Sequence, residues 1–184
     1  MIHEDIFIFL RIEQRKQTAM GQKLPIGIQS FEDLRSKGFK YVDKTALVYK
    51  MVTEGKYYFL SRPRRFGKSL LLNTLESYFL GKKELFEGLA IAELEHDWTE
   101  YPVLHLDLNT QQYGTEKALH NKIERELTVW ESIYGKATEE RDFGMRFEGV
   151  IKRAYEKTGR QVVILVDEYD KPLLQAIGNT ELQD

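Results

Sequence analysis

The stretch from Tyr57 to Leu80, YYFLSRPRRFGKSLLLNTLESYFL, constrains the fold more than any other part of the chain. It opens with an apolar run over 57–60, passes through a basic turn that ends in Gly67, Lys68 and Ser69, and continues with leucines at helical spacing. A strand, a tight loop ending in Gly-Lys-Ser and a helix follow one another in this way in phosphate-binding P-loops. The stretch therefore predicts a strand over 57–60, a phosphate-binding loop and a helix.

The residue types of this loop suit a polyphosphate. Backbone N–H groups of the loop and of the first helical turn would point at the phosphates, and the helix dipole adds partial positive charge there. Gly67 allows unusual backbone dihedral angles, Lys68 would reach the β and γ phosphates, and the Ser69 hydroxyl would bind Mg²⁺. The predicted nucleotide-binding residues are Arg62, Pro63, Arg64, Arg65, Phe66, Gly67, Lys68, Ser69 and Leu70.

One position departs from the usual pattern. The template G-x-x-x-x-G-K-[ST] has its first glycine where this chain has Arg62, and Pro63 follows it. The proline stiffens the same turn, and the arginines add positive charge that attracts an anion. The alternative interpretation is a basic turn that merely precedes a buried helix.

A second stretch supplies acidic residues. The run from Gln161 to Asp170, QVVILVDEYD, is apolar until Asp167 and Glu168, which predicts a parallel strand buried on both faces. Carboxylates at the carboxyl end of such a strand lie where open α/β sheets bind ligands. Asp167 would then hold Mg²⁺, and the predicted catalytic residues are Glu168, which would polarise the water that attacks the γ phosphorus, and Lys68, which would contact the β and γ phosphates. Otherwise the acids only mark the end of a strand.

With both stretches, the chain resembles the predicted AAA-ATPase-like family, bacterial proteins that usually carry a nuclease-like domain after the ATPase part. The resemblance spans about residues 24–184, and Arg62 in place of the first glycine is usual in that family. It implies an ATP-binding domain and leaves its biological role open. The runs that carry it are LPIGIQSFEDLR (24–35), YVDKT (41–45), YYFLSRPRRFGKSLL (57–71), GKKELFEGL (81–89), YPVLHLDL (101–108) and VVILVDEYDKPL (162–173).

The order of the elements predicts an α/β fold with a parallel sheet flanked by helices. A further strand is expected over 101–108, helices over 115–134 and 139–157, and a helical linker over 81–98. P-loop NTPases with a glutamate beside the magnesium aspartate insert one more strand between the loop strand and the Asp-Glu strand. That strand is not among these 184 residues, so we expect a domain incomplete at its C-terminus, or a partner that supplies the strand. Open apolar edges would then favour association, including homo-oligomers.

The segment before the loop contains two predicted helices. Ser30 is a plausible N-cap for a helix that reaches Lys37, and residues 44–53 have helical spacing. Tyr41 and Asp43 could touch adenine, although a core tyrosine and a helix-capping aspartate are the favoured interpretation. Residues 1–23 are expected to be an extension from an upstream start, and residues 24–184 the domain.

Composition excludes several classes of function. The chain has no cysteine, which rules out disulfides, thiolate nucleophiles and cysteine metal sites and suits a cytoplasmic protein. The apolar run over 6–10 is too short to span a bilayer and has acidic residues before it, so we expect neither a signal peptide nor a membrane partner. A net charge of −2 gives no overall nucleic-acid footprint.

The predicted function is binding of ATP with Mg²⁺, as part of an ATPase. Adenine is favoured over guanine because no Asn-Lys-x-Asp run is present. Two alternatives stay open: a protein-interaction module with a vestigial site, and a nucleic-acid-dependent NTPase of a defence or mobile-element system. In the latter, Arg62, Arg64 and Arg65 would bind phosphodiesters, or a C-terminal region would bind nucleic acid. His105 is expected to be an ordinary core or surface histidine, whereas Asp107 and Asn109 could order magnesium-bound water.

Overall fold

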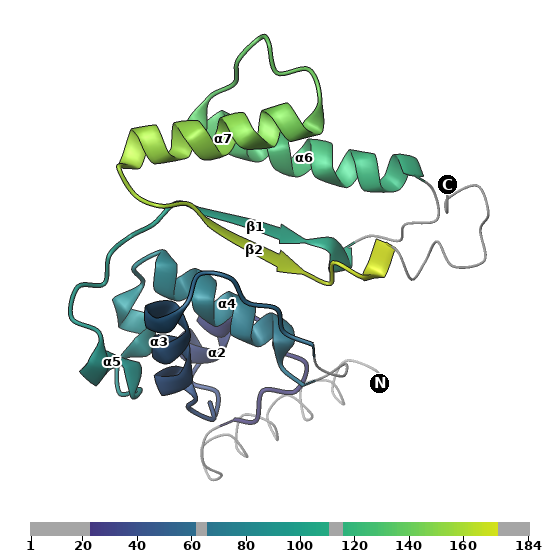
Figure 1. Ribbon diagram of the computed structural model, residues 1–184. Coiled ribbons are helices and arrows are strands. Elements are labelled where there is room, and N and C mark those ends of the chain that lie inside the picture. Colours follow the sequence, from purple (N-terminus) through teal and green to yellow (C-terminus); the bar gives the residue numbers. More distant parts are fainter. Residues whose placement is uncertain (1–22, 62–65, 111–115, 173–184) are drawn as a thin grey trace, which may run out of the picture.

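A two-stranded parallel sheet lies at the centre of the molecule (Figure 1). The computed structural model describes residues 23–61, 66–110 and 116–172. Strand β1 (Val103–Asp107) pairs with β2 (Val163–Asp167) so that Val103 lies opposite Val163 and Asp107 opposite Asp167. Both strands were predicted, and the α/β class with a parallel sheet is confirmed.

Two long helices cover one face of the sheet (Figure 1). They are α6 (Glu116–Tyr134), which matches its prediction, and α7 (Phe143–Thr158). The second helix was predicted from residue 139 but begins at Phe143, because the Asp142 side chain accepts a hydrogen bond from the Met145 N–H and caps it there. The buried residues between this pair of helices and β1 are Leu104, Leu127, Trp130 and Val150.

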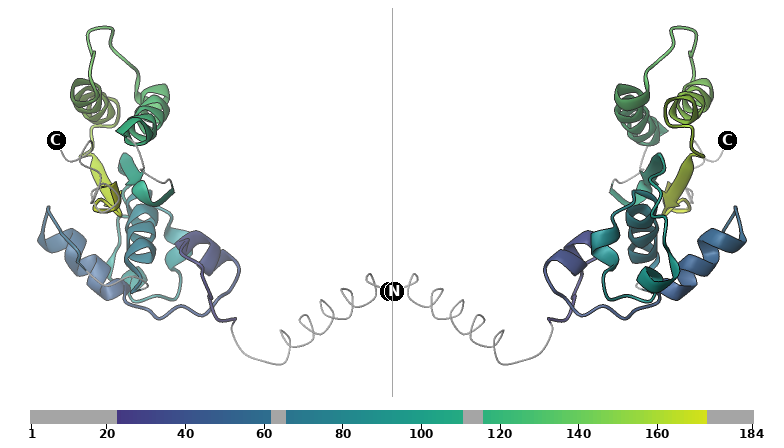
Figure 2. Two further views of the ribbon diagram at one scale, coloured as in Figure 1. Left: turned by 90° about the vertical axis from the view of Figure 1, so that its right-hand side faces the viewer. Right: turned by 90° about the vertical axis from the view of Figure 1, so that its left-hand side faces the viewer.

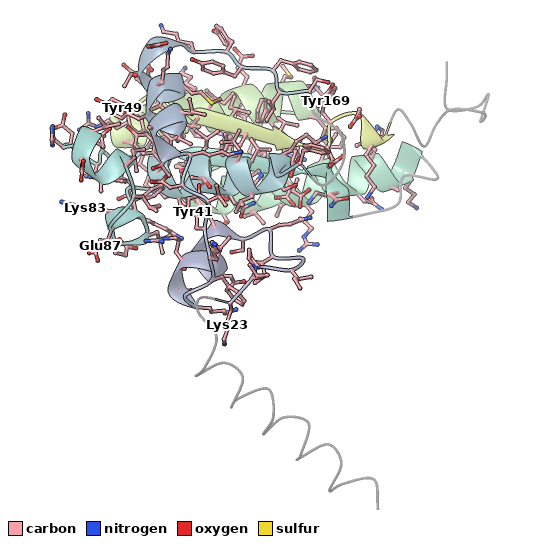
Figure 3. All side chains as sticks on the ribbon, turned by 90° about the horizontal axis from the view of Figure 1, so that it is seen from below. Lys23, Tyr41, Tyr49, Lys83, Glu87 and Tyr169 are labelled. Carbon is pink, nitrogen blue, oxygen red and sulfur yellow. The ribbon has the colours of Figure 1, made fainter. Side chains whose placement is uncertain are left out.

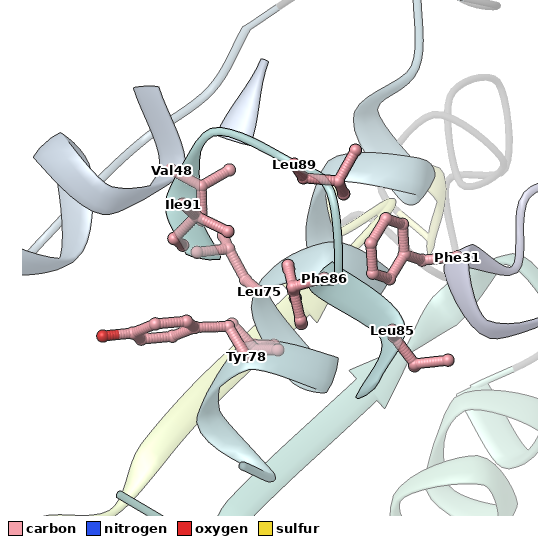
Figure 4. Packing of buried hydrophobic residues seen from close by; sticks show 9 residues of the cluster. Phe31, Val48, Leu75, Tyr78, Leu85, Phe86, Leu89 and Ile91 are labelled. Carbon is pink, nitrogen blue, oxygen red and sulfur yellow. The ribbon is translucent and has the colours of Figure 1, made fainter. Parts of the chain in front are cut away.

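Short helices pack on the other face around α4, which lies directly against the sheet (Figure 1). They bury a cluster made of Phe31, Val48, Leu75, Tyr78, Leu85, Phe86, Leu89, Ile91 and Leu165 (Figure 4). Because Leu165 comes from β2, this cluster fixes α4 on the sheet. The elements are α2 (Phe31–Ser36), α3 (Thr45–Glu54), α4 (Lys68–Phe79), the 3-10 turn η1 (Lys83–Phe86) and α5 (Ile91–Leu94), with a second 3-10 turn, η2 (Leu108–Thr110), after β1.

Local capping explains where the early helices start. The Ser30 hydroxyl accepts a hydrogen bond from the Asp33 N–H at 3.1 Å, as its predicted N-cap role requires. Asp43 accepts from the Thr45 N–H and hydroxyl and, with its other oxygen, from the Ala90 N–H at 2.7 Å. Burial opposes ionisation, but these hydrogen bonds outweigh it and lower the pKa of Asp43. Asp43 thus has the structural role that was favoured for it.

The predicted strand over 57–60 is wrong. These residues have no regular secondary structure and pair with neither β1 nor β2. Tyr57 and Phe59 are 95% and 72% exposed, and Phe59 contacts the Tyr169 ring edge to face with ring centres 5.5 Å apart. An extended segment becomes a strand only when a neighbour satisfies its N–H and C=O groups, and in the described sheet β2 forms its ladder with β1 alone.

Two further expectations need correction. Strand β2 was predicted to be buried on both faces, but Ile164 and Val166 are 45% and 40% exposed, because α6 and α7 pack mainly over β1. Figure 2 shows α6 and α7 on one side of the two strands and α2, α3 and α4 on the opposite side, to which Leu165 points. The linker over 81–98 is not one helix but the two short pieces η1 and α5, separated by Gly88 with a φ of 73°.

Candidate functional site

The first turn of α4 starts at a glycine in a left-handed conformation. Gly67 is the N-cap, with φ 76° and ψ 26°, and no side chain among the described residues caps the helix. A Cβ at this position would meet no atom of the described residues within 4 Å, whereas the φ of 76° is one that residues with a Cβ seldom adopt, so the backbone angle favours glycine here. The leading N–H groups of a twelve-residue helix, together with its dipole, therefore form an anion-attracting end.

Lys68 and Glu168 meet although one hundred positions separate them in the sequence. The Lys68 Nζ lies 3.7 Å from Glu168 Oε1, and each side chain is 21% exposed. The start of α4 and the ends of both strands lie at the same side of the molecule in Figure 1. The loop helix and the Asp-Glu strand, which the sequence predicted to be two halves of one site, are thus brought together. The catalytic roles of both residues stay predictions.

Acidic residues end both strands at this edge. Asp167 is only 5% exposed, and its register partner on β1 is Asp107. One oxygen of Asp107 accepts a hydrogen bond from the Asn109 N–H at 2.7 Å, so this carboxylate also orders the turn after β1. Ser69 is half-buried in the first turn of α4.

This donor set fits magnesium bound together with phosphates. Within residues 23–61, 66–110 and 116–172, no group of three or more His, Cys, Asp or Glu side chains is placed to hold a metal ion. Mg²⁺ differs from metals that need such a cage, because it keeps several waters and usually binds one or two carboxylates plus substrate phosphates. Ser69 and Asp167 supply one hydroxyl and one carboxylate of that kind.

The other predicted loop residues are placed as follows. Phe66 is 64% exposed, and Leu70 is half-buried against the cluster beneath α4. The predicted residues 62–65 lie outside the described residues. Figure 3 shows Tyr169 at the end of the sheet to which the β2 arrow points, beside this site.

His105, expected to be a satisfied core or surface histidine, has a hydrogen-bond partner at only one of its two ring nitrogens within the described part of the chain. It lies on β1, and its Nδ1 is 3.0 Å from Glu76 Oε2 of α4, while its buried Nε2 has no hydrogen-bond partner in the described part of the chain. The bond to Glu76 outweighs burial and raises the pKa of His105, and the charges of Asp107 and Asp167 add to this effect.

Sequence reasoning missed Lys171. Its ammonium group donates to the backbone carbonyl oxygen of Asn109 at 2.5 Å and lies 3.3 Å from the Asn109 Oδ1. Its own N–H donates to the Glu168 carbonyl oxygen at 3.0 Å. The available signal was its position three residues after Glu168, which suits a turn, but no local pattern indicated Asn109 as its partner.

The family model described as "Predicted AAA-ATPase" matches residues 25–184. An uncharacterized protein in the vnfD 5′ region of Azotobacter chroococcum mcd 1 is 42% identical over 163 residues, which cover 88% of this chain and 31% of that protein. The chain therefore spans about a third of this relative. No solved structure matches the chain significantly.

Proposed function

Because this chain belongs to the family of predicted AAA-ATPases, we propose that it binds ATP with Mg²⁺ and forms part of an ATPase that hydrolyses the bond between the β and γ phosphates. The observation that carries the proposal is the 3.7 Å approach of Lys68 Nζ to Glu168 Oε1. It supports a P-loop type of fold, because it joins an uncapped helix start to a pair of acids at the carboxyl end of a parallel strand.

Each residue has a distinct task in this proposal. The N–H groups of the first α4 turn and the Lys68 ammonium bind the phosphates. Ser69 and Asp167 would hold Mg²⁺, which would supply charge neutralisation for the phosphates. Glu168 accepts a hydrogen bond from the attacking water and directs it toward the γ phosphorus.

The contact between Lys68 and Glu168 also has a consequence for binding. Lys68 has a carboxylate near it in this structure, and an incoming phosphate competes with that carboxylate for the ammonium group. Nucleotide binding would therefore separate Lys68 from Glu168 and leave Glu168 available to water.

Calorimetric titration of the 184-residue chain tests the proposal. We expect ATP to bind with Mg²⁺ present, to bind less tightly with a chelator, and to be preferred over GTP. In the Asp167→Asn variant, adding Mg²⁺ should increase the affinity for ATP much less than in wild type, because the neutral amide attracts the ion less. An absence of ATP binding under all of these conditions would overturn the proposal and favour a protein-interaction module.

The exposed apolar residues beside β2 favour self-association of the chain. Phe59, Ile164 and Val166 are all at least 40% exposed, and β2 has a free edge within the described sheet. We expect sedimentation to show association that increases with protein concentration and that the Ile164→Lys variant weakens. A matched change on the far side of α7, Lys152→Glu, should have no such effect; equal association of all three proteins would contradict this prediction.

Glu148 and Lys152 face solvent on α7, so the control substitution alters surface charge without touching the sheet. The self-association experiment is independent of nucleotide and does not decide the ATPase proposal.

A further inference from the structure

Lys171 joins the turns that follow the two strands. Its ammonium group contacts both the carbonyl oxygen and the side-chain oxygen of Asn109, just after β1. Its backbone N–H is bonded to Glu168, just after β2. A single residue thus connects the carboxyl ends of β1 and β2 at the edge where the candidate site lies.

The backbone that Lys171 holds is unfavourable by itself. Glu168 has a φ of 52°, in the left-handed region that residues with a Cβ seldom adopt. Such a conformation persists only where surrounding contacts impose it. The hydrogen bond from the Lys171 N–H to the Glu168 carbonyl closes this turn, and the ammonium group anchors the turn to Asn109.

The turn determines where the Glu168 carboxylate points. Because β2 ends at Asp167, the sheet no longer fixes the next residue, and its side chain reaches Lys68 from the turn alone. On the other side of the anchor, the Asn109 N–H donates to Asp107. Loss of the anchor would therefore free Glu168 and loosen the turn beside Asp107, while α4 and Gly67 would keep their places.

We propose that Lys171 is a positioning residue that holds the Glu168 carboxylate in place for attack on the phosphate. This inference rests on the proposed ATPase function. It assigns Lys171 a role in the rate of hydrolysis and little role in nucleotide affinity, because its ammonium group is engaged by Asn109 and not by the helix start that would bind phosphates.

Three proteins test the inference: Lys171→Met, which removes the ammonium group, Lys171→Arg, which keeps a donor, and the exposed control Lys152→Ala. In Lys171→Met we expect kcat for ATP to fall by about tenfold to a hundredfold, the cost of a small misplacement of a reacting group. The dissociation constant for ATP should not rise, since the phosphate-binding groups are unchanged, and it should fall modestly because the released Glu168 carboxylate competes less for Lys68. Lys171→Arg should recover part of the rate, and Lys152→Ala should match wild type.

Backbone hydrogen exchange provides a reading that needs no nucleotide. We expect Lys171→Met to increase the rate of hydrogen exchange in residues 168–172, and Lys171→Arg to increase it less. Neither variant should change the exchange rate in β1 residues 103–106. Unchanged exchange in Lys171→Met would overturn the inference whatever the enzyme assays show. Equal losses of affinity and of kcat would also overturn it, because Lys171 would then act in binding.

A double substitution separates this inference from the proposed function. In wild type, Glu168→Gln should tighten ATP binding because it removes the carboxylate that competes for Lys68. In the Lys171→Met background, Glu168→Gln should tighten ATP binding less, since the Glu168 carboxylate is no longer held beside Lys68. An equal gain in both backgrounds would overturn the positioning role. A wild type that binds no ATP would overturn the ATPase proposal instead, and hydrogen exchange would still decide whether Lys171 holds the turn.

Discussion

Replacing Lys68 by alanine is expected to weaken binding of ATP by roughly tenfold to a hundredfold. Hydrogen bonds that involve a charged group contribute about 1.5–3 kcal/mol each, and 1.4 kcal/mol corresponds to a tenfold change in affinity. Lys68 begins α4 directly after Gly67 and is only 21% exposed, so water screens its charge incompletely. The substitution also leaves Glu168 without the positive charge that now faces it, and this carboxylate would repel the phosphates.

Lys50→Ala is the matched control for this experiment. Lys50 lies on α3, is 65% exposed, and forms an ion pair with Glu54 at 3.8 Å within the same helix. Titration calorimetry with Mg²⁺ and ATP should show wild-type affinity for Lys50→Ala and the large loss only for Lys68→Ala. Circular dichroism should show that both variants are folded. Equal affinity of the Lys68→Ala and wild-type proteins would contradict the assignment of the loop.

The second large effect concerns stability. Arg146 of α7 is buried and binds Glu131 of α6 through Nε at 2.6 Å and Nη2 at 2.9 Å, while Nη1 reaches Glu124 at 2.5 Å. Glu131 is also buried. Arg146→Ala would leave that buried carboxylate with only the largely exposed Lys136, whose Nζ lies 3.6 Å away, and breaking a buried ion pair costs about 3–5 kcal/mol. We expect a loss of unfolding free energy of this size.

Urea denaturation followed by circular dichroism measures the loss. The double variant Arg146→Met with Glu131→Leu is the informative comparison, because apolar residues of similar size can replace a buried ion pair with little cost. It should be markedly more stable than Arg146→Ala alone. Arg153→Ala cannot serve as a neutral control for Arg146→Ala. Arg153 binds both Glu140 and the Gly135 carbonyl oxygen, so its removal also breaks contacts. If Arg146→Ala unfolds at the wild-type urea concentration, the ion pair does not support the packing of α6 on α7.

The same ion pair predicts a pH dependence. The hydrogen bond from Arg146 lowers the pKa of Glu131, although burial opposes the effect. A lowered pKa in the folded state adds stability above the ordinary glutamate value of 4.5, and this stability is lost as the pH falls through the folded-state pKa. The stability difference between wild type and Arg146→Ala should therefore be largest near neutral pH and shrink in acid. A difference that is constant from neutral to strongly acidic pH would contradict this.

Features that depend on a few neighbouring residues could be predicted from the sequence. The Ser30 hydroxyl accepts an N–H three residues later, as its predicted N-cap role requires, whereas the same role of Asp142 was missed although it too depends only on adjacent residues. Gly67 allows the left-handed angle at the start of α4, and the apolar run ending in Asp167 and Glu168 predicts β2 and its polar end. The types of the candidate residues follow from the same local patterns.

Pairing and contact between distant segments were decided only by the tertiary structure. Residues 57–60 have the composition of a strand, yet β1 and β2 pair with one another and leave that segment without a ladder partner in the described sheet. The Lys171 contact with Asn109 spans 62 positions, and no local pattern encodes it. Strand pairing and long-range ion pairs depend on which surfaces remain free once the chain has folded, whereas caps, turns and apolar periodicity depend on adjacent residues.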